Sequence, residues 1–192
     1  NGYIEDELCG LRFRISSKSF YQVNPEQTQI LYRTAIDFAI LTGKETVLDA
    51  YCGTGTIGLI AAGKAKNVIG VENNEAAVRD AEVNAKVNGV QNVRFLKGDA
   101  AEYMKKAADN KADRPDVVIM DPPRSGASEE FLGALVKANP SRVVYVSCCM
   151  ETLRRDLKVL CGGGYELRRV RAVDMFPMTV HVEVIIMMQY CG

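Results

Sequence analysis

Cys148 and Cys149 follow a short apolar segment, VVYVS at 143–147, and precede a stretch with helical character. A thiol at the start of a helix can act as a nucleophile, because the helix dipole stabilises its thiolate. A cysteine at the end of an apolar strand also commonly does no more than fill the core. Position alone therefore leaves Cys148 open between covalent catalysis and packing.

A glycine-rich segment, DAYCGTGTIG at 49–58, connects an apolar strand to a helix. Gly53, Gly55 and Gly58 fit the pattern GxGxxG. Glu72 ends the next strand, where a carboxylate can accept hydrogen bonds from both hydroxyls of a ribose. These features fit a dinucleotide and S-adenosylmethionine equally well.

Asp49 separates these two cofactors. A carboxylate just before the glycines would repel a pyrophosphate bound at the helix N-terminus, but it attracts the ammonium and sulfonium groups of S-adenosylmethionine. Two unit charges about 4 Å apart near a protein surface interact by roughly 4 kcal/mol before desolvation. The segment therefore favours S-adenosylmethionine, with a purely structural aspartate as the alternative. Asp99, after the third strand, is placed to meet the adenine amino group, to cap the next helix, or both.

A second motif, DPPR at 121–124, ends another apolar strand. Ligands of such sheets bind beyond the carboxyl ends of the strands, and two prolines stiffen the backbone and end the ladder. Methyltransferases that act on exocyclic amines have a similar motif with an aromatic residue after the prolines. Arg124 at this position argues against nitrogen methylation. The alternative is a rigid turn that carries an exposed arginine.

The elements that must position these residues alternate between strands and helices. Strands are expected at 46–51, 67–72, 92–97, 116–121, 142–147, 165–173 and 182–189, and helices at 56–64, 74–88, 100–109, 128–138 and 150–161. Continuously apolar strands are typical of a parallel sheet covered on both faces. The sequence predicts an α/β, Rossmann-like fold with a mostly parallel seven-stranded sheet. No helix separates the last two strands, which predicts an antiparallel last strand.

Composition limits the possible functions. The 192 residues, 47% of them hydrophobic, are enough for one domain with a full core. Lys plus Arg and Asp plus Glu number 24 each, so net charge gives no argument for nucleic acid. The six cysteines have no CxxC spacing, which argues against a zinc site or a disulfide framework and suits a reducing cytoplasm. No apolar segment reaches membrane-spanning length.

Five ordered motifs resemble the RNA uracil-5-methyltransferase family and extend from Ser19 to Glu183. They are SFYQVN (19–24), DAYCGTG (49–55), DPPR (121–124), VSC with LRRD (146–148 and 153–156), and DMFP with HVE (174–177 and 181–183). The first is closer to the ribosomal-RNA branch than to the transfer-RNA branch. The resemblance implies S-adenosylmethionine-dependent methylation of carbon 5 of uridine in RNA, ribosomal RNA before transfer RNA, by a Rossmann-like methyltransferase fold.

The resemblance also implies roles. Cys148 is the nucleophile and Glu183 the general base, which is preferred over His181. Together with the arguments above, the expected cofactor contacts are Gln22, Asp49, Tyr51, Gly53, Gly55, Glu72, Asp99 and Asp121. The expected substrate contacts are Phe20, Arg124 and His181. No metal ligands are expected.

The chemistry explains the need for a thiol and a base. Carbon 5 of uracil is a poor nucleophile, and a thiolate that adds at carbon 6 moves electron density onto it. After carbon 5 takes the methyl group, a base must remove its proton so that the thiolate can leave. Asp121 and Arg124 can orient the ring and stabilise its enolate oxygen.

The chain departs from the family after the nucleophile. Family members usually continue with Asn-Pro, whereas this chain has Cys149 and Met150. The following turn is therefore open to change, and Cys149 is a competing thiol. Cys148 is preferred because it directly follows Val-Ser.

Residues 1–41 are expected to form a hairpin and a lead-in helix left from a preceding region, and residues 42–192 the catalytic domain. Asn1 as the first residue indicates an excised piece, and full-length relatives of this type carry an N-terminal RNA-binding barrel. Six basic residues can meet phosphates or form a solvated face: Arg154, Arg155, Lys158, Arg168, Arg169 and Arg171. The alternatives are a methyltransferase for a small molecule or an amine nitrogen, and a non-catalytic fragment that binds cofactor or RNA.

Overall fold

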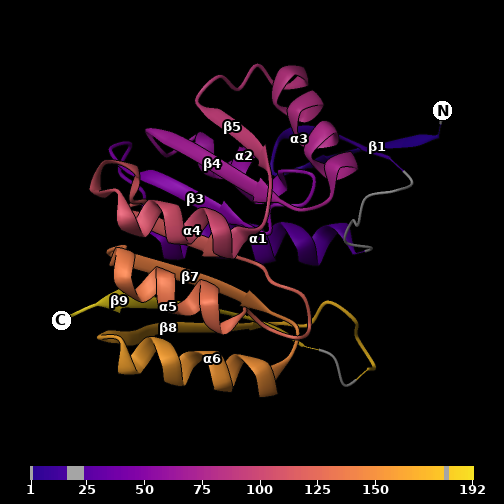
Figure 1. Ribbon diagram of the computed structural model, residues 1–192. Coiled ribbons are helices and arrows are strands. Elements are labelled where there is room, and N and C mark those ends of the chain that lie inside the picture. Colours follow the sequence, from indigo (N-terminus) through magenta and orange to yellow (C-terminus); the bar gives the residue numbers. More distant parts are fainter. Residues whose placement is uncertain (1, 17–23, 180–181) are drawn as a thin grey trace.

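The computed structural model describes residues 2–16, 24–179 and 182–192 (Figure 1). Strands and helices alternate along most of the chain, and their ends lie within two residues of the expected ones. The elements are β1 (Tyr3–Leu8), β2 (Leu11–Ser16), α1 (Pro25–Ala39), β3 (Thr46–Ala50), α2 (Thr56–Ala62), β4 (Asn67–Glu72), α3 (Glu75–Val87), β5 (Val93–Lys97), α4 (Ala100–Asp109), the 3-10 turn η1 (Lys111–Asp113), β6 (Val117–Met120), α5 (Glu129–Ala138), β7 (Arg142–Ser147), α6 (Met150–Gly162), β8 (Tyr165–Val173) and β9 (Glu183–Tyr190).

Seven strands form one sheet in the order β5-β4-β3-β6-β7-β9-β8. The first five run parallel, and β9 runs antiparallel to both β7 and β8. This confirms the expected α/β fold with an antiparallel last strand. From β3 the chain builds outward first through β4 and β5, and then on the other side through β6 and β7. The carboxyl ends of β3 and β6 therefore flank the switch point where open α/β sheets bind ligands.

The central strands β3, β4, β6 and β7 are buried on both faces, as their continuously apolar sequences predict. Val47 of β3 belongs to the core under α1, α2 and α3, whereas the next residue, Leu48, belongs to the core under α4, α5 and α6. Figure 1 shows α4, α5 and α6 in front of the sheet and α1 and α2 behind it. Because side chains alternate between the faces of a strand, Asp49 points to the α1–α3 side.

The N-terminal hairpin shares the main core rather than standing apart. Leu8 and Phe13 are fully buried in the same hydrophobic cluster as Leu31 of α1. The two turn residues, Cys9 and Gly10, have φ values of 55° and 82°. Two successive left-handed residues form the type of turn whose twist matches paired strands. The division at residues 41 and 42 into a remnant and a catalytic domain stays a prediction.

Within the described ranges, no helix is both long enough and apolar enough to cross a membrane. The same residues contain no group of three or more His, Cys, Asp or Glu side chains that could hold a metal ion.

Candidate active site

The glycine-rich turn leaves β3 through residues in the left-handed backbone conformation. Tyr51, Gly53 and Gly55 have φ values of 64°, 53° and 79°. A side chain at Gly55 would not fit, because its Cβ would lie 2.5 Å from the ring of Phe95. The N–H of Gly55 donates to the carbonyl of Cys52 at 2.8 Å and closes the turn. The glycine pattern thus lets the turn pack directly against β5.

Glu72 is already oriented by this turn. One carboxylate oxygen accepts the N–H of Gly53 at 3.1 Å, and the other accepts the N–H of Asn74 at 2.7 Å. Each carboxylate oxygen has two acceptor sites. Glu72 therefore keeps acceptor capacity for hydroxyls in the cavity that it lines.

Asp49 lies below the turn and is 1% exposed. Among the described residues, neither of its carboxylate oxygens has a well-formed hydrogen bond. Burial raises the pKa of Asp49 to about 8; the N–H of Gly58 opposes this shift, and the carboxylates of Asp121 and Glu72 add to it. A buried carboxyl group without partners is costly as an anion, so a cation above the turn would favour its charged form.

A cavity of about 800 Å³ opens at the carboxyl ends of all five parallel strands. Eight of the expected site residues line it: Tyr51, Gly53, Glu72, Asp99, Asp121, Arg124, Cys148 and Glu183. Asp49 and Gly55 do not line it, and lie beneath and behind the turn. Phe20, Gln22 and His181 fall outside the described residues.

Asp99 caps a helix at the rim of the cavity. Its Oδ1 accepts the N–H groups of Ala101 at 2.8 Å and Glu102 at 3.1 Å. The capping interpretation is thereby confirmed, whereas the contact with adenine stays a prediction. Asp99 can cap the helix and contact adenine at the same time, because the cap uses only its Oδ1 and not its Oδ2.

Four other residues that line the cavity were not predicted from the sequence. Tyr32 has no signal, because on α1 it follows the helical spacing of core residues. Phe176 lies within the DMFP motif, which could have pointed to it. Cys52 and Thr54 lie inside the glycine-rich segment but have no chemistry that singles them out. All four line the cavity.

The antiparallel direction of β9 brings Glu183 to this edge of the sheet. Ser147 is paired with Val184 at the end of the β7–β9 ladder. Cys148 follows Ser147 and Glu183 precedes Val184, so the thiol and the carboxyl group are neighbours one step beyond the last paired residues. Residues 35 positions apart in the sequence thus reach the same wall of the cavity.

Burial raises the pKa values of two carboxyl groups in this wall, Asp121 and Glu183. Burial raises the pKa of Asp121 to about 7, and the Glu183 carboxylate adds to the rise. Burial also raises the pKa of Glu183, against the lowering effect of Arg124. The protonated form of Asp121 is therefore accessible near neutral pH, and the raised pKa of Glu183 is in the direction that suits a group that exchanges protons with a substrate.

The two adjacent thiols have opposite environments. Burial and the carboxylates of Glu183 and Asp121 raise the pKa of Cys148. Cys149 occupies the N-cap of α6, where Thr152 lowers the pKa of its thiol. The helix stabilisation that the sequence predicted for Cys148 thus falls on Cys149, because one residue separates the end of the strand from the cap. Only Cys148 of the two lines the cavity.

The loop after the DPPR motif is fixed by a buried aspartate of α6. Asp156 is completely buried; its Oδ2 accepts the N–H of Ala127 at 2.9 Å and the hydroxyl of Tyr145 at 2.7 Å. Arg155 donates to Oδ1 of Asp156 at 2.8 Å and also to two carbonyl groups of the loop. The LRRD motif therefore holds the segment that carries Arg124.

The sequence of the chain is similar to those of known RNA methyltransferases. The family model described as tRNA (uracil-5-)-methyltransferase matches residues 3–190. An uncharacterized RNA methyltransferase of Halalkalibacterium halodurans is 52% identical over 181 residues, which cover 94% of this chain and 39% of the relative. A second one, from Caldanaerobacter subterraneus, is 53% identical over 180 residues, which cover 94% of this chain and 40% of the relative. This chain thus spans about two fifths of the length of these curated relatives.

Among solved structures, the chain is similar to the Pyrococcus abyssi tRNA (uracil-54, C5)-methyltransferase in complex with S-adenosyl-L-homocysteine. The TM-score is 0.84 and the sequence identity 33%, over 97% of this chain and 44% of the other.

Proposed function

The chain belongs to the tRNA (uracil-5-)-methyltransferase family, and we propose that it carries the catalytic centre of an enzyme that transfers a methyl group from S-adenosylmethionine to carbon 5 of uridine in RNA. The observation that carries the proposal is the joint placement of Cys148 and Glu183 in the cavity that Glu72 and the glycine-rich turn also line. A thiol and a base beside a cofactor cavity are what this reaction needs.

The cavity fits S-adenosylmethionine. Glu72 keeps acceptor positions for ribose hydroxyls, and Asp99 is the residue that we propose to meet the adenine amino group. Asp49, buried without a well-formed hydrogen bond among the described residues, favours a positive charge above the turn. Tyr51 and Gln22 are further contacts implied by the family. When bound, S-adenosylmethionine supplies an electrophilic methyl group.

The chain's own residues perform the remaining chemistry. The Cys148 thiol first gives its proton to a neighbouring carboxylate, a role that we assign to Asp121. The thiolate then forms a bond to carbon 6, and the electron pair of the ring's 5,6 double bond becomes available at carbon 5, which takes the methyl group. Arg124 donates toward the enolate oxygen that develops. Glu183 then accepts the proton from carbon 5, the 5,6 double bond reforms, and the carbon–sulfur bond breaks to release the thiolate.

The substrate is an RNA, and ribosomal RNA is the class that we propose. The support is the SFYQVN motif, which resembles the ribosomal branch. The solved relative that acts on transfer RNA makes transfer RNA the alternative. Methyl transfer from tritiated cofactor to purified ribosomal RNA and transfer RNA, each free of the modification, separates the two.

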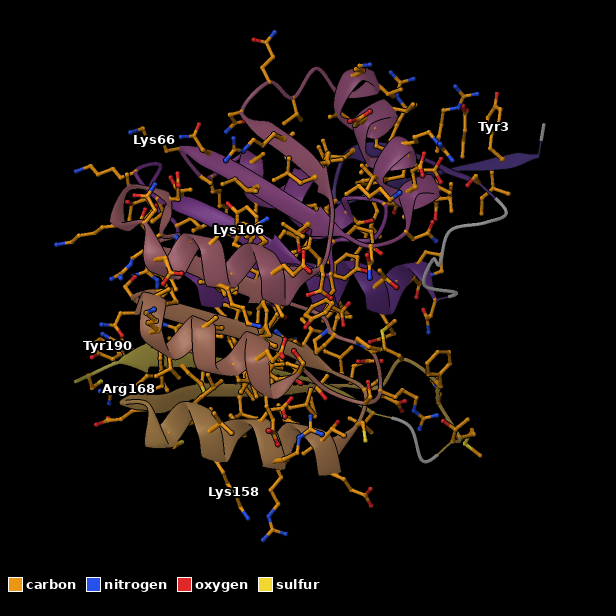
Figure 2. The ribbon with its side chains drawn as sticks, viewed as in Figure 1. Tyr3, Lys66, Lys106, Lys158, Arg168 and Tyr190 are labelled. Carbon is orange, nitrogen blue, oxygen red and sulfur yellow. The ribbon has the colours of Figure 1, made fainter. Side chains whose placement is uncertain are left out.

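Four of the six candidate basic residues form no ion pair among the described residues, and one of these four, Arg169, lies over the ring of Phe38 at 5.7 Å. Arg155 is committed to Asp156, and Arg168 to Glu166 at 2.9 Å. Arg168 also lies at the end of the sheet remote from Cys148, near Tyr190, whereas Lys158 extends outward from α6 (Figure 2). The proposed phosphate contacts are Arg154, Lys158, Arg169 and Arg171.

RNA that contains 5-fluorouridine tests the mechanism, because fluorine at carbon 5 cannot leave as a proton does. We expect the native chain to form a stable adduct with this RNA in the presence of S-adenosylmethionine. Cys148→Ser should abolish the adduct, and Cys149→Ser should retain it. The reverse pattern would overturn the assignment of Cys148.

A second candidate is a fragment that binds cofactor without turnover. It is favoured by the share of the relatives that the chain spans, about two fifths. Calorimetry with S-adenosylmethionine followed by tritium transfer to bulk RNA separates it from a complete catalytic centre. A methyltransferase for a small molecule or an amine nitrogen would instead need Asp49 and Glu72 but not Cys148 or Glu183.

A further inference from the structure

Helix α3 covers the free edge of the N-terminal hairpin with a row of polar side chains. Three side chains spaced four residues apart accept hydrogen bonds from alternate backbone N–H groups of β2. The pairs are Asp80 with Ser16 at 3.1 Å, Asn84 with Arg14 at 2.7 Å, and Asn88 with Arg12 at 2.9 Å. Figure 1 shows the hairpin beside α3.

The match follows from the geometry of the two elements. Four residues of an α-helix rise about 6 Å, and two residues of a strand rise about 6.6 Å. A helix with short polar side chains every fourth residue can therefore satisfy every second residue of a strand. An unpaired strand edge needs such a cover.

Asn84 differs from the other two because it also reaches the glycine-rich turn. It is completely buried, and its amide nitrogen donates to the carbonyl of Thr54 at 3.2 Å. One turn earlier on α3, Ala81 packs so closely that a Cβ at Gly55 would lie 2.9 Å from it. The turn therefore rests on α3 at two consecutive residues, Thr54 and Gly55.

We propose that Asn84 is a positioning residue of the cofactor site, and that through it the hairpin supports the glycine-rich turn. An amide side chain is required because one end must accept and the other must donate. Thr54 lines the cavity between two left-handed glycines, so its carbonyl direction fixes the path of the turn. The inference rests on the proposed function in one respect, namely that the cofactor binds at this turn.

Asn84→Asp is the sharpest test. When ionised, the carboxyl group has the same shape and keeps the acceptor for Arg14, but it faces the Thr54 carbonyl with a second acceptor. Because burial raises the pKa of a carboxyl group, binding is measured at about pH 9. Asn88→Asp is the matched control, because Asn88 also bonds both ways to the hairpin, accepting from and donating to Arg12, without reaching the turn. Binding of S-adenosylhomocysteine is measured by calorimetry, and the midpoint of thermal unfolding is measured for each chain.

We expect both variants to lower the thermal midpoint, and only Asn84→Asp to weaken binding of S-adenosylhomocysteine, by about tenfold. Such a loss means that the turn holds its binding conformation about one tenth of the time. Equal affinities of Asn84→Asp and the native chain would overturn the inference, as would an equal loss in both variants. A native chain that does not bind S-adenosylhomocysteine would instead overturn the proposed cofactor, and with it this inference.

If Asn84→Asp does not fold, Asn84→Ala and Asn88→Ala are compared in the same way. Removal of the side chain leaves the Thr54 carbonyl without its donor but introduces no repulsion. The same split between affinity and thermal midpoint is expected, with a loss of affinity of about fivefold.

Discussion

The cofactor side of the cavity, formed by residues 49–58, 72 and 99, and the catalytic side, formed by residues 121–124, 148 and 183, are built in different ways. On the cofactor side, backbone N–H groups and close-packed glycines hold side chains that lie on consecutive strands. On the catalytic side, the groups come from three distant segments. The parallel pairing of β6 and β7 brings residues 121–124 to Cys148, and the reversed direction of β9 beside β7 adds Glu183. A local sequence motif can therefore specify the cofactor side, whereas the catalytic side depends on the pairing of strands that are distant in the sequence.

The charges of the two sides differ as well. On the cofactor side, Asp49 is sealed beneath the turn, whereas on the catalytic side Asp121, Arg124 and Glu183 all line the cavity. A sealed carboxyl group can act only through its field, and open ones can exchange protons with a substrate. Substitutions should therefore separate binding from turnover.

Glu183→Gln should have the largest effect, and only on the catalytic side. Without a base the proton at carbon 5 stays, so turnover should fall by about 10²- to 10⁴-fold while cofactor affinity is unchanged. The methylated adduct should then accumulate on ordinary RNA, which a denaturing gel shift detects. Glu166→Gln, at the exposed remote end of β8, is the control. Unchanged turnover in Glu183→Gln would remove the carboxyl group from the mechanism.

Asp156→Ala should come second and should also leave the cofactor side intact. It removes the acceptor of the Tyr145 hydroxyl and the Ala127 N–H, so the free energy of unfolding should fall by about 3 kcal/mol. The salt bridge with half-exposed Arg155 adds little to this figure. Turnover should drop by about tenfold to a hundredfold, because the segment that carries Arg124 loses its anchor.

Thermal unfolding, initial rates and cofactor calorimetry on the same preparation check this prediction. Asp109→Ala, which breaks an exposed ion pair with Lys137, is the control and should change none of the three. A loss of cofactor affinity equal to the loss of turnover in Asp156→Ala would contradict the separation of the two sides.

Most of the fold was predictable from the sequence, because the central strands β3, β4, β6 and β7 are largely apolar segments and each is followed by a helix. The strand order was not predictable, because the sequence of residues 183–190 does not indicate that this strand lies between β7 and β8. That Cys148 and Glu183 lie close together was therefore predicted only from the family resemblance. The register between β7 and β9 explains why they do.

The electrostatics and the long-range supports were the least predictable. A helix after Cys148 predicted a stabilised thiolate, but burial beside Glu183 and Asp121 reverses the direction of its pKa shift. Asn84 carries no signal in the sequence, because its role depends on a hairpin about 70 residues earlier in the chain.

The next prediction concerns how the stability of the ligand-free chain changes with pH. The pKa of Asp49 is raised from 3.8 to about 8 and that of Asp121 from 3.8 to about 7. Between about pH 4 and 8 the folded chain therefore holds protons that the unfolded chain has released, and the free energy of unfolding falls as pH rises. The thermal midpoint of the ligand-free chain should thus decrease from about pH 5 to 8, and Asp49→Asn should flatten this decrease.

Cofactor affinity should show the opposite trend on the same side of the cavity. Deprotonation of Asp49 favours a cation, so affinity for S-adenosylmethionine should rise about fivefold relative to S-adenosylhomocysteine between about pH 6 and 8. Calorimetry with both ligands measures the ratio. A ratio that stays constant with pH in the native chain, or that still rises in Asp49→Asn, would show that this carboxyl group does not sense the sulfonium.

The double substitution Cys149→Asn with Met150→Pro should have the smallest effect, although it lies next to the nucleophile. Cys149 has φ and ψ values of −138° and 110°, an extended conformation that the residue before a proline prefers. Asparagine is a strong N-cap and proline suits the first helical position, so the pair that the family usually has there fits the α6 start of this chain.

We expect the thermal midpoint of this double variant to rise by about 2–4 °C. Adduct formation with 5-fluorouridine RNA should stay within about twofold of the native rate, because Cys149 only occupies the N-cap position and Cys148 supplies the reacting sulfur. Lost adduct formation in a variant that folds would mean that the Cys149 thiol takes part in the chemistry. The catalytic side would then depend on two thiols, and its assembly would rest on the N-terminus of α6 as well as on the β7–β9 register.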